Sequence, residues 1–415
     1  MELEDNYLKA FKFKSDSHKI KELEKDYWSI IEANKSKAFD KWEFTGKFIT
    51  NNEKNKKVFN VDYAADLQTD KYGSGFPTID QNKVLGMHPW NFKNLNNRPD
   101  SLLQFWKDEA ISGINIPWLY IGMLYSSFCW HYEDIMMYSI NYMHQGFGKM
   151  WYGIPLQDGA KFERVAKQKH KDQNKEDPNF LLNINTMISP GYLVERGVTV
   201  YSTLQKPGEF ILTFPGSYHA GFSAGFNVAE AVNFSAPSWL NYVERAMDIY
   251  FKSREKVPVF PFQWLVIENL LNNDVEIIED VNKDHFTIDE SSSHSVFTKE
   301  TYQKLLEIAE KTVKDEIIYR NIAREDFNKK LKSKKMYEEK LKDSDDVDKI
   351  SNECYFCVNL PYASFLECSK WKIRYCSYHG LHCKCSAQYI KLKIRFTDDE
   401  LKEVLLRKIK TKLNA

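Results

Sequence analysis

At 415 residues, of which 43% are hydrophobic, the chain is long enough for two or three domains and can bury a substantial core. This composition excludes an intrinsically disordered or fibrous protein. Basic and acidic residues both number 58, so the formal charge is zero and no chain-wide field holds the protein on nucleic acid or an anionic membrane. Any such contact has to come from a local patch.

The N-terminal segment, residues 1–58, is lysine-rich and polar, and an amphipathic stretch from Ile20 to Ile31 predicts a helix. Its start has neither the basic residues nor the apolar run of a signal peptide, which predicts a protein of a reducing compartment. Residues 110–132 carry no charged side chain, but polar residues, proline and glycine interrupt them. We therefore expect two buried strands there and no membrane helix.

The middle segment, residues 59–250, changes to aromatic residues, glycines and short apolar runs separated by turn residues. This pattern predicts an antiparallel β barrel or sandwich. Residues 251–349 then predict a helical linker domain, whose clearest helix has Thr298 as its N-cap. The lysine-rich run 329–342 is expected to be the solvated continuation of that helix, because glutamates interrupt its basic patch.

The C-terminal part is expected to hold a Cys/His zinc-binding module at residues 350–390, followed by a strand and a helix within residues 391–415. The sequence Thr-Asp-Asp-Glu at 397–400 predicts a capping box that opens the final helix. The apolar face of this helix would consist of Leu401, Val404, Leu405 and Ile409.

A candidate metal site lies in the middle segment. His131 and Glu133 end a strand-like run, where side chains two residues apart point the same way, and His219 offers a third ligand from a separate strand. Two histidines and one carboxylate with open positions form the facial arrangement of non-haem Fe(II) oxygenases. His170 and Asp172 have the same spacing as His131 and Glu133, but they lie in a charged stretch that favours a solvated loop.

The strands after this motif carry polar side chains in alternation. Ser139 and Asn141 share one face, and Lys149 and Trp151 share a face farther along. A lysine that points into a barrel is costly unless it meets an anion, so Lys149 is a candidate for binding a carboxylate. The alternative is a Lys149 that faces solvent.

Taken together, these residues resemble the JmjC-domain oxygenases, most closely the JARID branch of histone H3 lysine 4 demethylases. The matching blocks follow one another in order between about 59 and 240: VDYAADL at 61–67, YGSGFP at 72–77, WLYIGM at 118–123, FCWHYED at 128–134, YSINY at 138–142, KMWYG at 149–153, GEF at 208–210 and AEAVNF at 229–234. The resemblance implies a mainly β catalytic core, a double-stranded β-helix or cupin-like jelly roll, that houses Fe(II) and 2-oxoglutarate. Flanking α-helices and a small C-terminal zinc-binding module would complete the fold.

The resemblance also implies roles for single residues. The iron ligands would be His131, Glu133 and His219. The residues that bind 2-oxoglutarate would be Tyr63, Phe128, Ser139, Asn141 and Lys149. The pocket for the methylated lysine would be shaped by Tyr120, Trp151 and Asn233. The chain departs from the family at Ser223, where an asparagine is common.

Six of the seven cysteines lie between residues 354 and 385, and in a reducing compartment this density indicates zinc. The spacing predicts a closed tetrahedral site of Cys354, Cys357, Cys376 and His379. The JARID resemblance predicts a second zinc held by two Cys-x-Cys pairs, but Lys370 replaces one of the expected cysteines here. Cys368, Cys383 and Cys385 give three ligands, and His382 is a candidate for the fourth, although a ligand adjacent to Cys383 is geometrically awkward. The seventh cysteine, Cys129, is expected to be a packed core residue.

The function implied by the resemblance is a nuclear dioxygenase that removes methyl groups from histone lysine and releases succinate, CO2 and formaldehyde. Its substrate would be the tail of histone H3, methylated at lysine 4, and its partners would be chromatin and proteins that target it there, without a membrane. Two alternatives stay open: a JmjC protein hydroxylase with the same iron site, and a non-catalytic chromatin-binding scaffold. A scaffold has no need of an inward lysine, which disfavours the second alternative.

Overall fold

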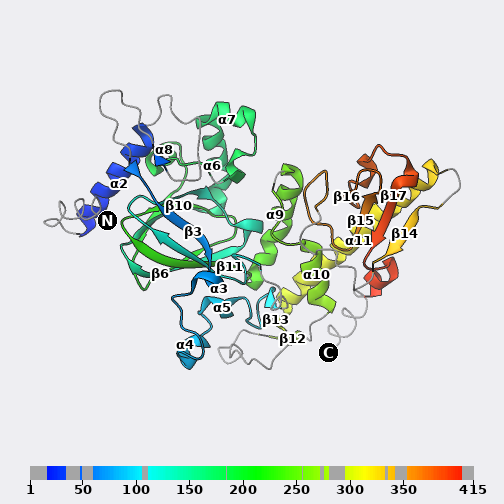
Figure 1. Cartoon of the computed structure of the whole chain (residues 1–415), viewed down its shortest axis with the longest axis horizontal. Coiled ribbons are helices and arrows are strands. Elements are labelled where there is room, and N and C mark those ends of the chain that lie inside the picture. The colour runs from blue at the N-terminus through cyan, green and yellow to red at the C-terminus, as the bar shows by residue number, and fades with distance from the viewer. Residues whose placement is uncertain are drawn as a thin grey trace.

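The computed structural model describes residues 16–33, 47–48, 59–104, 111–183, 185–254, 256–271, 275–279, 295–331, 335–341 and 353–403. A β-sandwich lies at one end of the molecule and a small sheet at the other (Figure 1). Between them stand three helices, α9 (Leu240–Ser253), α10 (Phe262–Leu271) and α11 (Lys299–Lys330).

The β-sandwich consists of two antiparallel sheets. One has the strand order β5 (Ser127–His131), β10 (Tyr218–Ser223), β7 (Lys149–Ile154) and β8 (Tyr201–Gln205). The other has the order β3 (Tyr63–Gln68), β4 (Trp118–Gly122), β11 (Asn227–Phe234), β6 (Tyr138–Gly146) and β9 (Phe210–Thr213). This architecture confirms the predicted cupin-like core, and β4 and β5 are the two strands expected within residues 110–132.

Helices cover the outer face of the four-stranded sheet. The predicted N-terminal helix is α2 (Asp16–Ala33), and the Tyr27 ring of this helix stacks on Phe222 of β10 at a centroid distance of 3.9 Å. Trp28 Nε1 also donates a hydrogen bond of 3.0 Å to the Tyr152 hydroxyl on β7. Helix α6 (Leu156–Lys169) adds buried Phe162 to the same core. Because this face is sealed by apolar packing, the inner face is left for polar chemistry.

Shorter elements complete the described chain. The short helices are α3 (Thr69–Tyr72), α4 (Lys83–Gly86), α5 (Phe92–Leu95), α7 (Lys171–Glu176) and α8 (Pro190–Val194). Two further strand pairs are β1 (Lys47–Phe48) with β2 (Phe59–Asn60), and β12 (Val275–Ile278) with β13 (Ser295–Thr298). In the part of the chain that these ranges describe, no helix is both long enough and apolar enough to cross a bilayer.

Helix α9 contacts both ends of the molecule through neighbouring residues. The Tyr250 hydroxyl donates a hydrogen bond of 3.0 Å to Asp134 Oδ1 and accepts one of 3.3 Å from the Ile135 amide. Ile135 has a φ of 51°, which is costly for a β-branched residue and persists only where the surroundings fix it. Phe251, which follows Tyr250 on α9, stacks on His379 of the Cys/His module at a centroid distance of 4.8 Å.

The C-terminal sheet has the order β14 (Tyr337–Lys340), β17 (Ile390–Ile394), β15 (Ser364–Cys368) and β16 (Ile373–Cys376). The prediction that residues 329–342 continue the long helix is therefore wrong: α11 ends at Lys330, and β14 pairs in parallel with β17. Charged residues suit an edge strand, where Glu339 forms a 2.7 Å ion pair with Lys393 of β17. The five-part division of the chain stays a prediction, although this sheet takes its strands from three of those parts.

Both predicted helix starts are confirmed. Thr298 Oγ1 accepts a hydrogen bond of 3.2 Å from the Thr301 amide at the start of α11. In the capping box, the Thr397 amide donates to Glu400 Oε2 at 2.7 Å, and the Glu400 amide donates to Thr397 Oγ1 at 3.2 Å. Leu401 is buried, whereas Val404, Leu405 and Ile409 lie outside the described residues.

A fully buried arginine joins α11 to the C-terminal sheet. Arg320 donates to Glu316 Oε1 at 2.9 Å, to the Ala363 carbonyl at 2.8 Å and to Asp398 Oδ1 at 3.0 Å. Since Glu316 is itself buried, each of the two buried charges compensates the other.

Replacing Arg320 with alanine should lower the free energy of unfolding by about 3–5 kcal/mol, because Glu316 would be left buried without its counter-charge. The matched control is Lys314→Ala on the same helix. Lys314 forms an exposed ion pair with Glu310, so its loss should lower the free energy of unfolding by less than about 1 kcal/mol. Urea denaturation of the three proteins measures both values. Equal stabilities for R320A and K314A would contradict the assigned role of Arg320.

Candidate metal and cosubstrate site

Three predicted ligands meet on the inner face of the four-stranded sheet. Antiparallel pairing places His219 of β10 opposite His131 of β5, and the two ring centroids lie 4.2 Å apart. Glu133 lies two residues beyond the end of β5, and its Oε1 lies 3.1 Å from His219 Nε2 and 3.9 Å from His131 Nε2. The three ligand atoms lie within 4.8 Å of one another, so one metal ion can contact them all.

Neighbouring groups aim these ligands at a common point. His131 Nδ1 lies 2.8 Å from the Cys129 carbonyl, and His219 Nδ1 lies 3.1 Å from the Ser217 carbonyl. A carbonyl can only accept, so each Nδ1 carries the proton and each Nε2 presents its lone pair to the centre. Asn233 Nδ2 donates a hydrogen bond of 2.8 Å to Glu133 Oε2, which leaves Oε1 facing the histidines.

The electrostatics favour the ligand forms of these side chains. Burial, followed by the proximity of His219, lowers the pKa of His131 to about 4, so that its ring is neutral near pH 7. Burial alone would raise the pKa of Glu133, but contact with His219 brings it well below its usual range. A neutral imidazole and an ionised carboxylate are the forms that bind a divalent metal.

Lys149 is an inward-facing cation on β7. Its side chain is only 2% exposed, which excludes the solvated alternative, and its Nζ lies 5.5 Å from the Tyr120 ring centroid and 5.7 Å from that of Phe128. Desolvation lowers the pKa of Lys149 to about 8. Among the described residues no carboxylate forms an ion pair with it, so a buried positive charge stands ready for an anion.

Polar atoms without partners lie near this cation. Ser223 pairs with Lys149 across β10 and β7, and Ser223 Oγ and Asn227 Oδ1 are buried without a hydrogen-bond partner among the described residues. Both atoms lie against Gly122, where an added methyl group would come within 2.7 Å and 3.0 Å of them. A bound carboxylate would satisfy the ammonium and the hydroxyl together, so the donors fit 2-oxoglutarate, and Ser223 supplies a hydroxyl where the family commonly has an amide.

The remaining predicted residues surround the same space. Phe128 packs on Trp151 at 4.6 Å, and the Trp151 ring stacks 6.0 Å from His219. The rings of Tyr63 and Tyr120 lie 6.1 Å apart on β3 and β4. These aromatic side chains therefore line the space around the metal ligands. The individual roles assigned to them stay predictions.

Three contributing residues were missed by the sequence analysis. Gln205 is fully buried, accepts a hydrogen bond of 2.9 Å from Trp151 Nε1 and donates one of 3.1 Å to Asn141 Oδ1. Thr213 Oγ1 lies 2.6 Å from Ser139 Oγ. Asp66 Oδ1 accepts a hydrogen bond of 2.9 Å from the Tyr120 hydroxyl. Gln205 and Thr213 belong to no recognisable motif, whereas Asp66 lies within the quoted block at 61–67.

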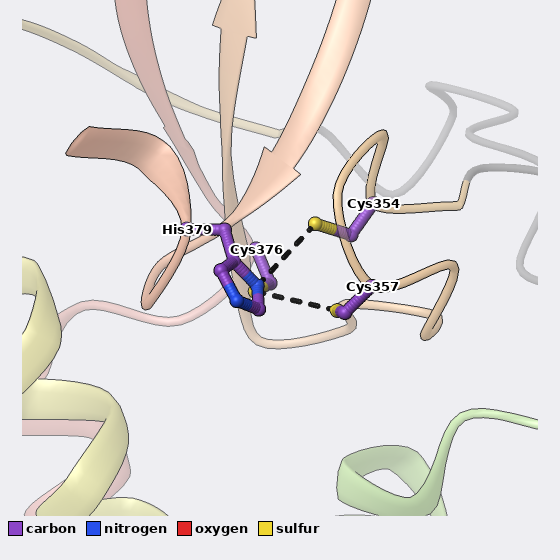
Figure 2. Close-up of side chains that lie close together, drawn as sticks. All are labelled: Cys354, Cys357, Cys376 and His379. Carbon is purple, nitrogen blue, oxygen red and sulfur yellow. Dashed lines mark hydrogen bonds between the residues drawn. The ribbon is translucent and has the colours of Figure 1, made fainter. Parts of the chain in front are cut away.

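The cysteine module brings together the first predicted zinc ligands. Cys354 and Cys357 on one loop face Cys376, at the end of β16, and His379, as Figure 2 shows. His379 Nδ1 lies 3.2 Å from Cys376 Sγ and 3.8 Å from Cys354 Sγ. Three thiols and one imidazole nitrogen in a buried group fit a closed structural zinc site.

The second group consists of the thiols of Cys368, Cys383 and Cys385, which lie within 4.8 Å of one another. The predicted fourth ligand, His382, is not part of this group, and its ring stacks on Phe356 at 4.4 Å. Cys129 is buried in the barrel as expected, while His170 and Asp172 lie at the junction of α6 and α7, outside every metal-binding group found in the described ranges.

An antiparallel jelly roll with two histidines and one carboxylate on its inner face defines the cupin-like class with a non-haem iron type of site. Comparison with known proteins agrees: the family described as "JmjC domain, hydroxylase" matches residues 118–234. Residues 118–234 of the chain therefore form a JmjC domain.

Two relatives extend the similarity. Lysine-specific demethylase JMJ17 of Arabidopsis thaliana is 32% identical over 394 residues, which cover 92% of this chain and 28% of the relative. Lysine-specific demethylase JMJ703 of Oryza sativa subsp. japonica is 37% identical over 246 residues, which cover 58% of this chain and 18% of the relative. The chain thus spans less than a third of the length of these relatives.

Replacing Lys149 with methionine should weaken 2-oxoglutarate binding by about ten- to a hundredfold or more, since a hydrogen bond to a charged group contributes about 1.5–3 kcal/mol. In the unchanged protein, affinity should fall as the pH rises above about 8, because Lys149 then loses the proton that attracts the carboxylate. Calorimetric titration of the Mn(II)-loaded protein from pH 6.5 to 9.5 measures both effects. Lys161→Met, at an exposed lysine, should keep the original profile, and a Lys149→Met variant with unchanged affinity would exclude this role.

Replacing Cys354 with serine should remove one tightly held zinc per chain and lower the melting temperature, because structural zinc contributes about 10–16 kcal/mol to the folding of isolated fingers. Elemental analysis and thermal unfolding give the two readouts. Lys384→Ala changes an exposed residue of the same module and should preserve both. Full zinc content in the Cys354→Ser protein would remove Cys354 from the ligand set.

Proposed function

We propose that the protein is an Fe(II)- and 2-oxoglutarate-dependent dioxygenase that removes methyl groups from histone lysine. The observation that carries this proposal is the coincidence of a two-histidine, one-carboxylate cluster with the buried cation Lys149 on one face of a JmjC jelly roll. The cluster can bind a metal ion, and the neighbouring cation can bind a carboxylate of a dicarboxylate such as 2-oxoglutarate. Both relatives are lysine-specific demethylases by name, which supports the same activity for this chain.

In the proposed mechanism, the chain holds its reactants through the contacts already described. His131 and His219 give their Nε2 lone pairs to the metal, and Asn233 holds Glu133 so that one carboxylate oxygen joins them. Lys149 and Tyr63 bind the distal carboxylate of 2-oxoglutarate, while Ser139, Asn141 and Phe128 line its binding site. When bound, Fe(II) with 2-oxoglutarate and O2 supplies the oxidising power that hydroxylates an N-methyl group, with succinate and CO2 as products.

The substrate pocket is proposed to lie between Tyr120, Trp151 and Asn233. The hydrogen bond between Tyr120 and Asp66 fixes the phenol ring at the pocket, and aromatic rings are good neighbours for a methylated ammonium group. A hydroxylated N-methyl group loses formaldehyde without further help, which leaves the lysine with one methyl group fewer. Lysine 4 of histone H3 is the proposed position, and a nuclear location, chromatin and targeting proteins go with that substrate.

A panel of methylated histone H3 peptides tests the reaction and its site. Incubation with Fe(II) and 2-oxoglutarate should release formaldehyde and remove the mass of one methylene group per methyl lost, most rapidly at lysine 4. A gain of one oxygen atom without formaldehyde would indicate a protein hydroxylase instead. Peptide binding without any product in the iron-loaded protein would indicate a scaffold.

Replacing His219 with alanine should abolish turnover and leave the fold intact, because two protein ligands hold Fe(II) poorly while the sandwich is stabilised by apolar packing. Formaldehyde release gives the activity, and circular dichroism with thermal unfolding reports the fold. His170→Ala is the matched control, since it removes a histidine that lies outside the site. Full activity in the His219→Ala protein would overturn the iron assignment.

A further inference from the structure

The second cysteine group differs from the first in the number of donors. Cys354, Cys357, Cys376 and His379 supply four ligand atoms, whereas Cys368, Cys383 and Cys385 supply three, and no other His, Cys, Asp or Glu atom of the described residues joins them. Structural zinc is almost always tetrahedral with four protein ligands. A zinc ion bound here would therefore have one coordination position to which the described residues contribute no donor.

Lys370, two residues after Cys368, cannot fill that position. A lysine ammonium has three hydrogen-bond donors and no lone pair. Its side chain is exposed, and Nζ lies 5.4 Å from the ring centroid of Trp371, which is itself 62% exposed. The cationic group is thus directed along the surface of the module.

The turn around Lys370 nevertheless keeps the form of a metal-binding loop. The Lys372 amide closes the turn on the Cys368 carbonyl at 2.8 Å. Cys368 also pairs with Ile373 of β16 and with Ile390 of β17. The position of Cys368 is therefore fixed by the sheet, while Lys370 lies in the turn that follows it.

His382 has a different partner. Its ring lies nearly parallel to that of Phe356, at a centroid distance of 4.4 Å and an angle of 9°. It also lies 5.5 Å from His379, a member of the first group. To reach the second group, His382 would have to leave this stack, although it directly precedes Cys383 in the chain.

We infer that Cys368, Cys383 and Cys385 form a three-thiolate zinc centre whose fourth position is open to a soft ligand from solution, a small thiol such as glutathione. Cys368 and Cys383 are buried, while Cys385 is only half-buried and gives access from the surface. The two zinc ions of the module then differ in character. The first is enclosed and structural, and the second is exchangeable and able to bind a thiol.

Zinc release from the full chain tests the first part of this inference. With 4-(2-pyridylazo)resorcinol as the chelator, we expect two zinc ions per chain, one of which leaves more than about tenfold faster than the other. A stoichiometry of one zinc at saturating Zn(II), or two ions released at the same slow rate, would overturn the inference. Replacing His382 with alanine should leave the fast phase unchanged, and a markedly faster release in that variant would show that His382 is the fourth ligand.

Lys370→Cys is the decisive variant, because it supplies a fourth thiolate to the group of Cys368, Cys383 and Cys385 from the turn that follows Cys368. The fast phase should slow by more than about tenfold and approach the slow one. Ser369→Cys, which adds a thiol one residue earlier, is the matched control and should keep the fast phase. Unchanged release from a folded Lys370→Cys protein would contradict an open position at this point.

Cobalt substitution tests the thiol ligand without depending on any variant. Glutathione added to the Co(II)-loaded protein should increase the thiolate-to-cobalt charge-transfer absorption by the contribution of one thiolate, and it should have no such effect on Lys370→Cys. A spectrum of the unchanged protein that does not respond to glutathione would show that the fourth position is closed.

Discussion

The pairing of β10 with both of its neighbours is the constraint on which the site depends. On one side it sets His219 opposite His131, and on the other it sets Ser223 opposite Lys149. A shift of one residue in either register would turn these side chains to the opposite face of the sheet. Every residue of β10 is buried, and the stacking of Tyr27 on Phe222 holds its outer face, so the metal site and the buried cation are fixed relative to each other.

The parts of the site that could be predicted are those governed by local geometry. Strand alternation predicted that His131 and Glu133 point the same way and that Lys149 shares a face with Trp151, and short cysteine spacings predicted that Cys354 and Cys357 lie together. The contacts that could not be predicted cross the fold between residues distant in sequence. Gln205 joins Trp151 to Asn141, and no local pattern distinguishes Gln205 from an ordinary strand residue. Asn233 was expected at the substrate pocket, but its hydrogen bond to Glu133 crosses from the opposite sheet and was not predicted.

The helices and strands of the fold were likewise predictable where they depend on local sequence, and unpredictable where they depend on distant pairing. Apolar periodicity and capping residues predicted α2, α11 and the capping box at Thr397, because these depend on interactions three or four residues apart. The charged residues of β14 were taken for helix because an edge strand and a solvated helix both tolerate lysine and glutamate. What selects the strand is its pairing with β17, more than fifty residues later, and that information is absent from the local sequence.

Helix α9 belongs to the apolar core that supports the metal site. A single apolar core includes Ile135 beside the metal site, Tyr250 of α9, Leu305 of α11 and Tyr362 of the cysteine module. The loop after Glu133 has left-handed backbone at Ile135 and Met136 and is held there by α9, which lies beyond the stretch that defines the family, residues 118–234. The contacts that hold the loop beside the metal site therefore extend past residues 118–234 to helix α9.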